Sequence, residues 1–291
     1  MGQSKLLIKP DYSRKEYIRV TPESAGWENL SFTAVKLQPG ETWQASTGEN
    51  EMALVILTGS ADIASNVGEW RKLGSRKTVF DGYPTTLFVS RGTDLTVTAA
   101  YGEVKFACGM AKANRTRPPV LVKPGDCSVE LRGGGNASRQ IVQMMLPGFP
   151  SDRLVAVEVF TPSGNWSSYP PHKHDERVLD ENGKVLEADL EEIYFYQVDK
   201  PEGFAYQRIY TPDRSIDDLI LVQHDDLVLS PEGYHPVVAA PGYNVYYLNF
   251  LAGSDQSLTA RDDPDYAWVK QTFDHLDPRV PFVHLQKTEE S

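Results

Sequence analysis

The sequence is poor in cysteine and has no long apolar run. Only Cys108 and Cys127 occur in 291 residues, too few for a disulfide framework and typical of a reduced, cytoplasmic protein. The N-terminus lacks the apolar stretch and cleavage site of a secretory signal. No apolar run reaches the roughly 18 residues that a membrane span needs. We therefore expect a cytoplasmic protein that does not contact a membrane.

Positive charge is also scarce. Lys and Arg number 29 against 40 Asp and Glu, which gives a net charge of -11 and argues against nucleic acid as a partner. No glycine-rich phosphate-binding or dinucleotide-binding motif is present. An anionic small molecule would therefore need a local positive feature to draw it in.

The chain consists mostly of short predicted strands. Residues with β-branched or aromatic side chains gather in segments such as "MALVILTGSADI", "TTLFVSRGTDLTVTAA" and "YNVYYLNFLAG", and Gly, Pro or Asp clusters separate these segments. The pattern, with 20 prolines and 22 glycines, predicts an all-β sandwich or barrel. One short amphipathic helix is predicted near the C-terminus, in "DPDYAWVKQTFDHLDP".

The two halves of the chain resemble each other. Glu51 opens "EMALVIL" and Gly92 marks a turn, whereas Glu192 opens "EIYFYQV" and Gly233 marks a turn. Both pairs keep the same offset of 141 positions, which predicts a duplicated β-barrel with a boundary near "RGGGNASRQ". The predicted parts are a first barrel without metal ligands, a second, metal-binding barrel and a C-terminal segment with a short helix, at 1–135, 136–262 and 263–291.

Histidine is absent from the first half and clustered in the second. His172 and His174 lie two apart in "YPPHKHDE", and residues two apart in an extended segment point to the same side. They can therefore direct two imidazoles into one cavity. His235, after the turn in "SPEGYH", can supply a third, and either Glu191 or Glu192 can supply a carboxylate, because a slip of one residue exchanges their faces.

This ligand set predicts a metal centre. Imidazoles with a carboxylate suit zinc, iron, manganese or nickel and leave positions open for substrate. An H-x-H pair alone is also an ordinary surface feature, so the prediction depends on the third histidine and the glutamate. The other three histidines are interpreted as surface or interface residues: His224, His275 and His284.

The order of these residues resembles the cupin pattern of H-x-H, a later Glu, then P-x-G and another His. The chain departs from the usual cupin spacing, because the 17 residues "DERVLDENGKVLEADLE" separate His174 from Glu192. Asn182-Gly183 within them is a strong signal for a two-residue hairpin. We therefore expect an extra hairpin at the rim of the barrel. "PEGYH" is one residue shorter than the usual second motif.

Longer stretches resemble one family of double cupins, the 5-deoxy-glucuronate isomerases of bacterial myo-inositol catabolism. They include "VEVFTPSGNWSSYPPHKHDE", "LEEIYFYQVDKPEGFAYQRIYT" and "LSPEGYHPVVAAPGYNVYYLNFLAG". The chain is more distantly similar to the 4-deoxy-5-ketouronate isomerases of pectin breakdown, in which a Glu directly before a Val-Tyr-Phe-Tyr-like run is a metal ligand. Carried over by position, this implies Glu192, which precedes Ile193-Tyr194-Phe195-Tyr196.

The resemblance implies an all-β fold of two tandem cupin-type barrels, a bicupin, with few short helices. It also implies aldose–ketose isomerisation of a small anionic sugar acid, from 5-deoxy-glucuronate to 5-dehydro-2-deoxy-gluconate. The implied cofactor is one divalent metal, with zinc as first choice and manganese, iron or nickel as alternatives. The implied ligands are His172, His174, Glu192 and His235.

The residues that would carry out the chemistry are less defined by the sequence. Tyr194, Tyr206, Tyr246 or a metal-bound hydroxide could act as the base of an enediol route, although each tyrosine also suits a packed strand. Arg208 or Lys173 could receive the substrate carboxylate, and Arg has the planar fork for this contact. A surface salt bridge explains Arg208 equally well, and Lys173 alternates away from the two histidines.

Two other functions are compatible with the same pattern. An Fe(II) cupin dioxygenase could use the same four ligands and would consume oxygen. A double cupin could also bind a sugar acid without catalysis, but no DNA-binding module of a regulator is recognisable. The oligomeric state stays open, with a homo-oligomer as one option.

Overall fold

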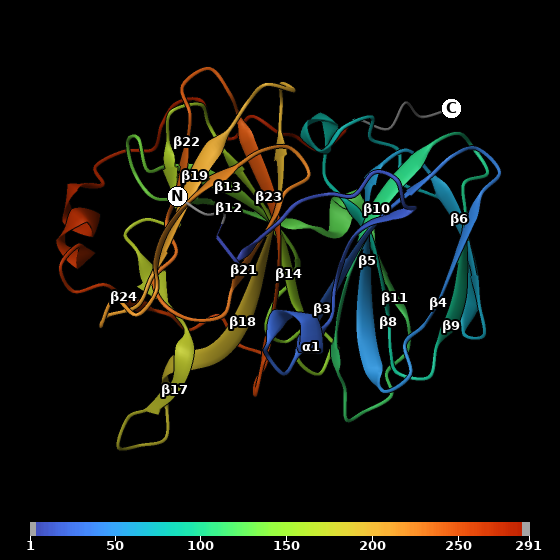
Figure 1. The fold of residues 1–291 in the computed structure, drawn as a ribbon, viewed down its shortest axis with the longest axis horizontal. Coiled ribbons are helices and arrows are strands. Elements are labelled where there is room, and N and C mark those ends of the chain that lie inside the picture. The colour runs from blue at the N-terminus through green and yellow to red at the C-terminus, as the bar shows by residue number, and fades with distance from the viewer. Residues whose placement is uncertain (1–3, 287–291) are drawn as a thin grey trace. The chain divides into compact units, whose positions relative to one another are not determined.

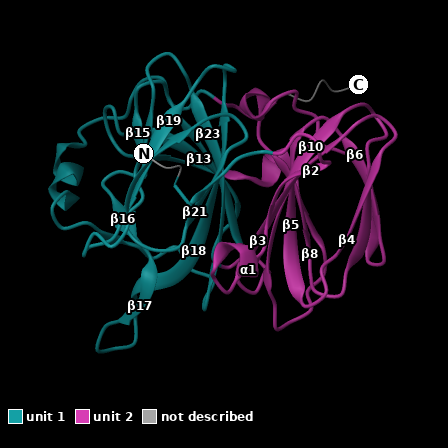
Figure 2. Ribbon diagram, in the orientation of Figure 1, with its two compact units in different colours: residues 1–10, 129–147, 155–282 teal, residues 11–128, 148–154, 283–291 magenta. Residues whose placement is uncertain are grey.

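The computed structural model describes residues 4–286, and almost all of its regular structure is β-strand (Figure 1). The chain forms two compact units (Figure 2): unit 1 contains residues 1–10, 129–147 and 155–282, and unit 2 contains residues 11–128, 148–154 and 283–291. The expectation of an all-β fold with few short helices is confirmed. Within the described residues, no helix is long and apolar enough to cross a membrane.

Unit 2 is built from two antiparallel sheets. The larger has the strand order β11-β8-β5-β10-β3-β2, and the smaller has the order β4-β9-β6-β7. The elements are β2 (Glu16–Val20), α1 (Pro22–Ala25), β3 (Leu30–Leu37), β4 (Thr42–Ser46), β5 (Asn50–Thr58), β6 (Ala61–Ser65), β7 (Gly68–Leu73), η1 (Val79–Asp81), β8 (Thr85–Val89), β9 (Asp94–Thr98), β10 (Val104–Lys112), β11 (Val120–Val122) and η2 (Pro124–Asp126). Alternate residues of these strands fill an apolar core.

Unit 1 repeats this plan and adds to it. Its larger sheet has the order β1-β21-β18-β23-β14-β13-β12, and β17 also pairs with β18. Its smaller sheet has the order β15-β22-β19-β20, and β16 pairs with β24 in a separate two-stranded sheet. The elements are β1 (Leu7–Ile8), β12 (Ser128–Arg132), β13 (Arg139–Met145), β14 (Val155–Thr161), β15 (Trp166–Ser167), β16 (His172–Lys173), β17 (Asp175–Leu179), β18 (Val185–Val198), β19 (Ala205–Tyr210), β20 (Asp217–Val222), β21 (Leu227–Ser230), β22 (Val237–Ala239), β23 (Val245–Gly253), β24 (Arg261–Asp262) and η3 (Ala267–Thr272). The predicted C-terminal helix is thus a single 3-10 helix, η3.

The predicted domain boundaries stay predictions, and the compact units run across them. The strand β1 lies at the start of the chain but pairs with β21 of unit 1. The segment 129–147 belongs to unit 1, whereas 148–154 belongs to unit 2. Each barrel therefore draws on pieces of chain that are not contiguous.

The sheet topology supports the internal repeat. β8, β5, β10 and β3 are consecutive neighbours in unit 2, and β21, β18, β23 and β14 are consecutive neighbours in unit 1. The smaller sheets correspond in the same way, strand for strand. The two turn glycines that suggested the repeat, Gly92 and Gly233, both have positive φ, 75° and 85°, a conformation that glycine adopts without steric cost.

The strand registers correct one detail of the repeat. Val89 and Ser230 both stand three residues before their turn glycine; Val89 pairs with Met52, and Ser230 pairs with Glu192. The counterpart of Glu192 is therefore Met52, and the alignment of Glu192 with Glu51 is wrong by one residue. Because side chains alternate along a strand, that shift turns Glu51 to the opposite face.

Glu51 has a different setting from Glu192. Its side chain is fully buried and accepts hydrogen bonds from the backbone N–H groups of Asp152, Arg153 and Leu154, at 2.7, 2.7 and 2.8 Å. Met52 belongs to the apolar core of unit 2. The inward position that carries a carboxylate in unit 1 thus carries a thioether packed in an apolar core in unit 2.

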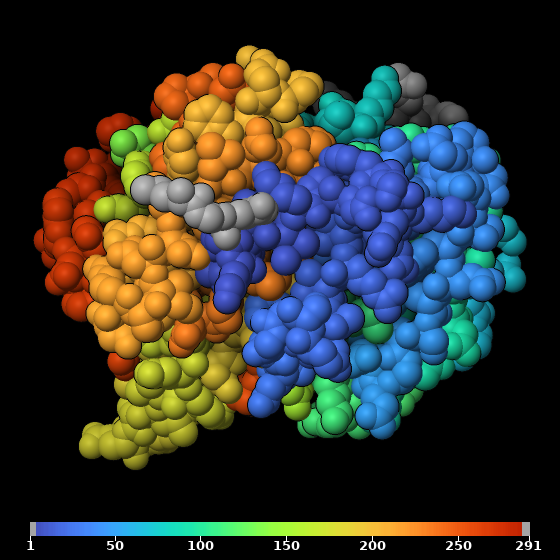
Figure 3. Space-filling model, viewed as in Figure 1, coloured from blue at the N-terminus to red at the C-terminus, as the bar shows by residue number. Residues whose placement is uncertain are grey.

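The residues inserted between His174 and Glu192 form the predicted hairpin, in which β17 pairs with the first part of β18. Its tip stands out from the rest of unit 1 (Figure 3). The loop has three residues, not two, because the Asp180 N–H bonds to the Lys184 carbonyl at 2.9 Å. The Asp180 carboxylate also accepts the backbone N–H groups of Asn182 and Lys184, and Gly183 takes the left-handed conformation, with φ of 80°.

Candidate metal centre

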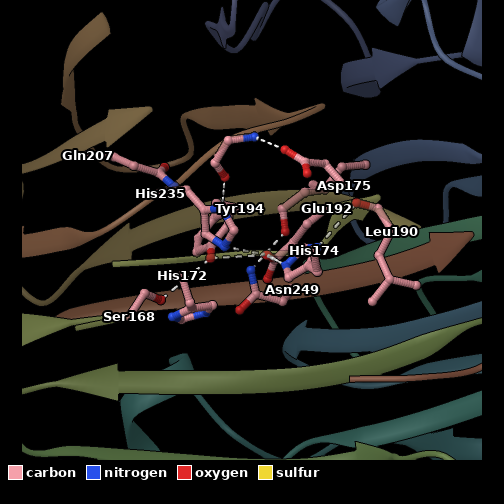
Figure 4. A network of polar contacts seen from close by, with 12 residues as sticks. Ser168, His172, His174, Asp175, Leu190, Glu192, Tyr194, Gln207, His235 and Asn249 are labelled. Atoms are coloured by element: carbon pink, nitrogen blue, oxygen red, sulfur yellow. Dashed lines mark hydrogen bonds and ion pairs between the residues drawn. The ribbon is translucent and has the colours of Figure 1, made fainter. Parts of the chain in front are cut away.

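Three segments of unit 1 bring the predicted ligands together (Figure 4). His172 lies on β16 and pairs with Asp262 of β24, and His174 follows two residues later. Glu192 lies on β18, opposite Ser230 of β21. His235 lies between β21 and β22.

The ligand atoms of His174, Glu192 and His235 all lie within 4.8 Å of one another, and all three residues are buried. Glu192 Oε2 is 3.0 Å from His174 Nε2 and 3.3 Å from His235 Nε2. The His172 ring lies beside this group, with its centroid 5.1 Å from that of His235. Tyr194 donates its hydroxyl hydrogen to Glu192 Oε2 at 3.1 Å.

The outer nitrogens of the three imidazoles all contact backbone carbonyls. His235 Nδ1 lies 2.8 Å from the Gly233 oxygen, His174 Nδ1 lies 3.2 Å from the Leu190 oxygen, and His172 Nδ1 lies 3.3 Å from the Pro170 oxygen. A proton on each Nδ1 leaves the Nε2 lone pair available, which is how metal-bound histidines are usually held. His235 Nε2 is buried and has no hydrogen-bond partner. The donor set therefore fits a divalent cation.

Burial controls the protonation of these histidines. It lowers the pKa of His172 and of His235 to about 3, so both imidazoles are neutral near pH 7, as metal binding requires. Burial also acts to lower the pKa of His174, but the hydrogen bond and charge of Glu192 outweigh it and raise the pKa.

His172, His174 and Glu192 line a cavity of about 550 Å³ within unit 1. The walls follow the two-residue period of the sheet: Glu192 and Tyr194 on β18, with alternate residues of β23, β14 and β13. The residues from these three strands are Tyr247, Asn249, Leu251, Val157, Val159, Arg139, Ile141 and Gln143. The cavity thus combines apolar side chains with polar and charged groups, as small-molecule sites do.

Of the three tyrosines predicted to act in catalysis, Tyr194 lines the cavity. The Tyr246 side chain alternates with that of Tyr247, is fully buried and donates its hydroxyl hydrogen to Glu158 at 2.8 Å. Tyr206 lies on β19 and lines a separate cleft of about 190 Å³. The structure therefore places only Tyr194 with the ligand group.

The two predicted carboxylate receptors are engaged elsewhere. Arg208 lines the smaller cleft and binds both carboxylate oxygens of Asp217, at 2.8 and 2.9 Å. Lys173 is buried and donates to Asp175 at 2.5 Å and to Glu187 at 2.6 Å. Neither lines the larger cavity among the residues that the structure describes.

Glu192, and not Glu191, belongs to the ligand group, and the other three histidines lie elsewhere. His224, His275 and His284 do not line the cavity within the described part of the chain. Glu192 points into the ligand group (Figure 4), and Glu191 lies on the opposite side of β18 by strand alternation.

Sequence reasoning missed several polar residues of the cavity wall, among them Arg139, Tyr247 and Asn249. Asn249 is buried and donates to the Ile193 carbonyl at 3.0 Å. The signal that could have found these residues is the alternation of "RQIVQMM" and "VYYLNFLAG", which places Arg139 on the same face as Ile141 and Asn249 on the same face as Tyr247.

The two barrels and the His/Glu group define a double cupin. A mutant of Bacillus subtilis oxalate decarboxylase superimposes with a TM-score of 0.56 over 84% of this chain and 74% of that chain, at 13% identity. That likeness concerns the fold alone. The crystal structure of an IolB-like protein from Salmonella typhimurium has a TM-score of 0.86 and 32% identity, over 91% of this chain and 98% of that chain.

The chain belongs to the KduI/IolB family, whose model matches residues 6–269. The 5-deoxy-glucuronate isomerase of Geobacillus thermodenitrificans is 43% identical over 255 residues, which cover 88% of this chain and 91% of that protein. The 5-deoxy-glucuronate isomerase of Geobacillus kaustophilus is 41% identical over 269 residues, 91% of this chain and 96% of that protein. The resemblance noted from the sequence is therefore confirmed.

Proposed function

We propose that this protein is an aldose–ketose isomerase that converts 5-deoxy-glucuronate to 5-dehydro-2-deoxy-gluconate in myo-inositol catabolism. The observation that carries the proposal is the buried group of His174, Glu192 and His235, of which His174 and Glu192 line a cavity of about 550 Å³. The relatives named 5-deoxy-glucuronate isomerase, at 43% and 41% identity over most of the chain, support it. The cavity lies within the usual size range for small-molecule sites.

The proposal includes one divalent metal per chain, with zinc as first choice, held by His172, His174, Glu192 and His235. The Nδ1 contacts to backbone carbonyls and the orphaned His235 Nε2 support this ligand set. When bound, the metal would stabilise negative charge that develops on the carbonyl and neighbouring hydroxyl oxygens of the sugar.

Among the three predicted tyrosines, we propose that Tyr194 acts on the substrate. Burial raises its pKa well above the usual range, so the hydroxyl keeps its proton near pH 7. Its hydroxyl lies 3.1 Å from Glu192 Oε2 and 3.5 Å from Ser168 Oγ, which in turn lies 3.3 Å from the Tyr247 hydroxyl. Tyr194 can therefore donate a hydrogen bond to a substrate oxygen and pass a proton along this hydroxyl cluster.

We place the reaction in the cytoplasm. Two cysteines in 291 residues are too few for a disulfide framework, which supports a reducing compartment.

The test is an anaerobic incubation of metal-loaded protein with 5-deoxy-glucuronate, followed by NMR of the aldehyde signal. We expect the aldehyde to disappear and a ketose to form without oxygen, nicotinamide or ATP. The matched control is the double variant His172→Ala, His174→Ala, which should neither retain the metal nor turn over substrate. Oxygen-dependent turnover of another substrate, with no ketose formed anaerobically, would instead identify a dioxygenase.

The same incubation in deuterated water reports the route of the hydrogen. Deuterium at the carbon that was the aldehyde indicates that a proton moves through an enediol. Absence of the label indicates a direct hydride shift or a shielded base, and the isomerase assignment holds in both cases.

A further inference from the structure

Arg139 is a buried cation whose guanidinium has no ion-pair partner in the described part of the chain. It opens β13, is 4% exposed and lines the cavity of unit 1. Its Nη1 atom is buried without a hydrogen-bond partner. Within residues 4–286, no carboxylate forms an ion pair with its guanidinium. Burial lowers the pKa of Arg139, but a guanidinium keeps its charge at any physiological pH.

Such a group is costly in a folded protein. A buried charge without a counter-charge loses its hydration and gains nothing in return, so buried charges in proteins are normally paired. An anion that enters the cavity would remove this cost by supplying the missing partner. An unpaired guanidinium in a cavity wall therefore indicates an anion-binding position.

The other cations in the cavity wall are already engaged. Arg132 binds both carboxylate oxygens of Glu130, at 2.7 Å each. Lys270 donates to Asp262 in a short contact. Arg139 is thus the one cation lining this cavity, among the described residues, whose charge is not neutralised by a carboxylate.

We propose that Arg139 binds the carboxylate of the sugar acid, at the end of the substrate remote from the reacting carbons. This inference rests on the proposed function and adds a residue that determines its substrate specificity. A guanidinium can hold both oxygens of a carboxylate with two parallel hydrogen bonds. The assignment replaces Arg208 and Lys173, whose charges are neutralised by Asp217 and by Asp175 with Glu187.

The sheet order gives Arg139 a suitable place. Glu192 lies on β18 and Arg139 on β13, with β23 and β14 between them. Three strand spacings of about 4.8 Å, roughly 14 Å in all, separate the two strands across the sheet. The registers also place Arg139 six residues further along the strand direction than Glu192, and both side chains line the same cavity. A sugar acid in this cavity can thus direct its aldehyde end to the ligand group and its carboxylate end to Arg139.

The arrangement also explains why an acid would be preferred over a neutral sugar. A sugar with a primary alcohol in place of the carboxylate would leave the Arg139 charge buried and unpaired. Sites with a buried polar group strongly reject substrates that cannot satisfy it. We expect the acid to be preferred on the order of 100-fold in kcat/KM, as for loss of one partner of a buried charged pair.

The experiment compares Arg139→Met, Arg139→Lys and the wild type on 5-deoxy-glucuronate and on its neutral analogue with a primary alcohol at C6. Arg139→Met should lower kcat/KM for the acid by about 100-fold, mainly through KM, and should leave the neutral analogue nearly unaffected. Arg139→Lys should recover part of the loss, because it restores the charge without the fork. The control Arg208→Gln, at a cation paired with Asp217 in a separate cleft, should change kcat/KM by less than about threefold.

Two further measurements show whether a loss of activity in Arg139→Met comes from the lost carboxylate contact or from misfolding. Metal content should be unchanged in Arg139→Met, and its midpoint of thermal unfolding should not fall, since the variant removes a charge that is unpaired in the native protein. If Arg139→Met discriminates between the acid and the neutral analogue as strongly as the wild type does, the proposal is overturned.

A failure of the proposed isomerase activity is distinguished by a binding measurement. Calorimetry with glucuronate and with glucose on the metal-loaded wild type and Arg139→Met requires no turnover. We expect the wild type to bind glucuronate more tightly than glucose, and Arg139→Met to lose the binding of glucuronate. This result would support Arg139 as the carboxylate receptor whatever the reaction. Equal affinity of both proteins for glucuronate overturns it.

Discussion

Replacement of Glu51 by Ala in unit 2 tests the strand register of the repeat. The Glu51 carboxylate is fully buried and accepts three backbone N–H groups, from Asp152, Arg153 and Leu154. Each buried N–H that loses its acceptor costs about 1–3 kcal/mol. Since Glu51→Ala also removes a desolvated carboxylate, we expect a net loss of roughly 3–6 kcal/mol in the free energy of unfolding.

Glu51→Gln should be milder, and its effect should depend on pH. Two of the three N–H groups donate to Oε1, a position that the amide oxygen can occupy. Burial raises the pKa of Glu51 above its usual value, so the native protein binds this proton more tightly than the unfolded chain does. The stability of the wild type relative to Glu51→Gln is therefore greatest below the unfolded-state pKa and falls as pH rises through the raised pKa.

The assay is urea unfolding followed by circular dichroism, together with elemental analysis. Glu49→Ala is the matched control, because its side chain is 72% exposed and lies 3.8 Å from its partner Arg91; it should change stability by less than about 0.5 kcal/mol. Metal content should be unchanged in all three variants, since the ligands lie in unit 1. A loss of metal in Glu51→Ala, or a stability equal to that of Glu49→Ala, would refute the register.

The remaining predictions concern unit 1. Glu192→Gln should weaken metal retention at least 100-fold, measured by chelator competition, and Glu191→Gln less than about threefold; reversed effects would show the strand to be misread by one residue. His235→Ala should lose the stoichiometric metal and keep its circular dichroism spectrum, and any metal bound to that variant at full stoichiometry would contradict the ligand set. Asp175 accepts the Gly233 N–H at 2.5 Å, and the Gly233 carbonyl contacts His235 Nδ1. Asp175→Asn should therefore weaken metal binding about 10- to 100-fold, and an unchanged affinity would show that Asp175 does not position His235.

The fold and the ligand group could be predicted because they depend on local patterns. Strand alternation and the H-x-H spacing predict which side chains share a face, and the turn at Gly233 places His235. The constant offset of 141 positions between the two halves misassigned Glu51 as the counterpart of Glu192. The offset between the turns does not reveal that β5 and β18 differ by one residue in their position relative to those turns. That difference decides the face on which Glu51 lies.

The contacts of the cationic residues could not be predicted from the sequence. Arg208 and Lys173 both have the right chemistry for a carboxylate, but Asp217 and Glu187 reach them only in the folded sheet. Arg139 has no distinguishing sequence neighbour. What sets it apart is the absence of a partner in a buried wall, and that is a property of the tertiary structure.

The strand that covers the edge of the larger sheet comes from a different part of the sequence in each barrel. In unit 2 the edge of β8 is covered by β11, which ends the first repeat. Moved by the offset of 141, β11 corresponds to the segment at β24, and β24 pairs with β16, which carries His172. The edge of β21 is covered instead by β1, from the start of the chain.

The pairing of β1 with β21 makes the start of the chain part of the barrel that holds the candidate site. A fragment that begins at residue 129 would contain all four proposed ligands but would leave the β21 edge open, and open edges invite pairing with other chains. The first repeat, in contrast, covers its own edge with β11. The second barrel is therefore a poor candidate for separate expression unless a strand equivalent to Leu7–Ile8 is supplied.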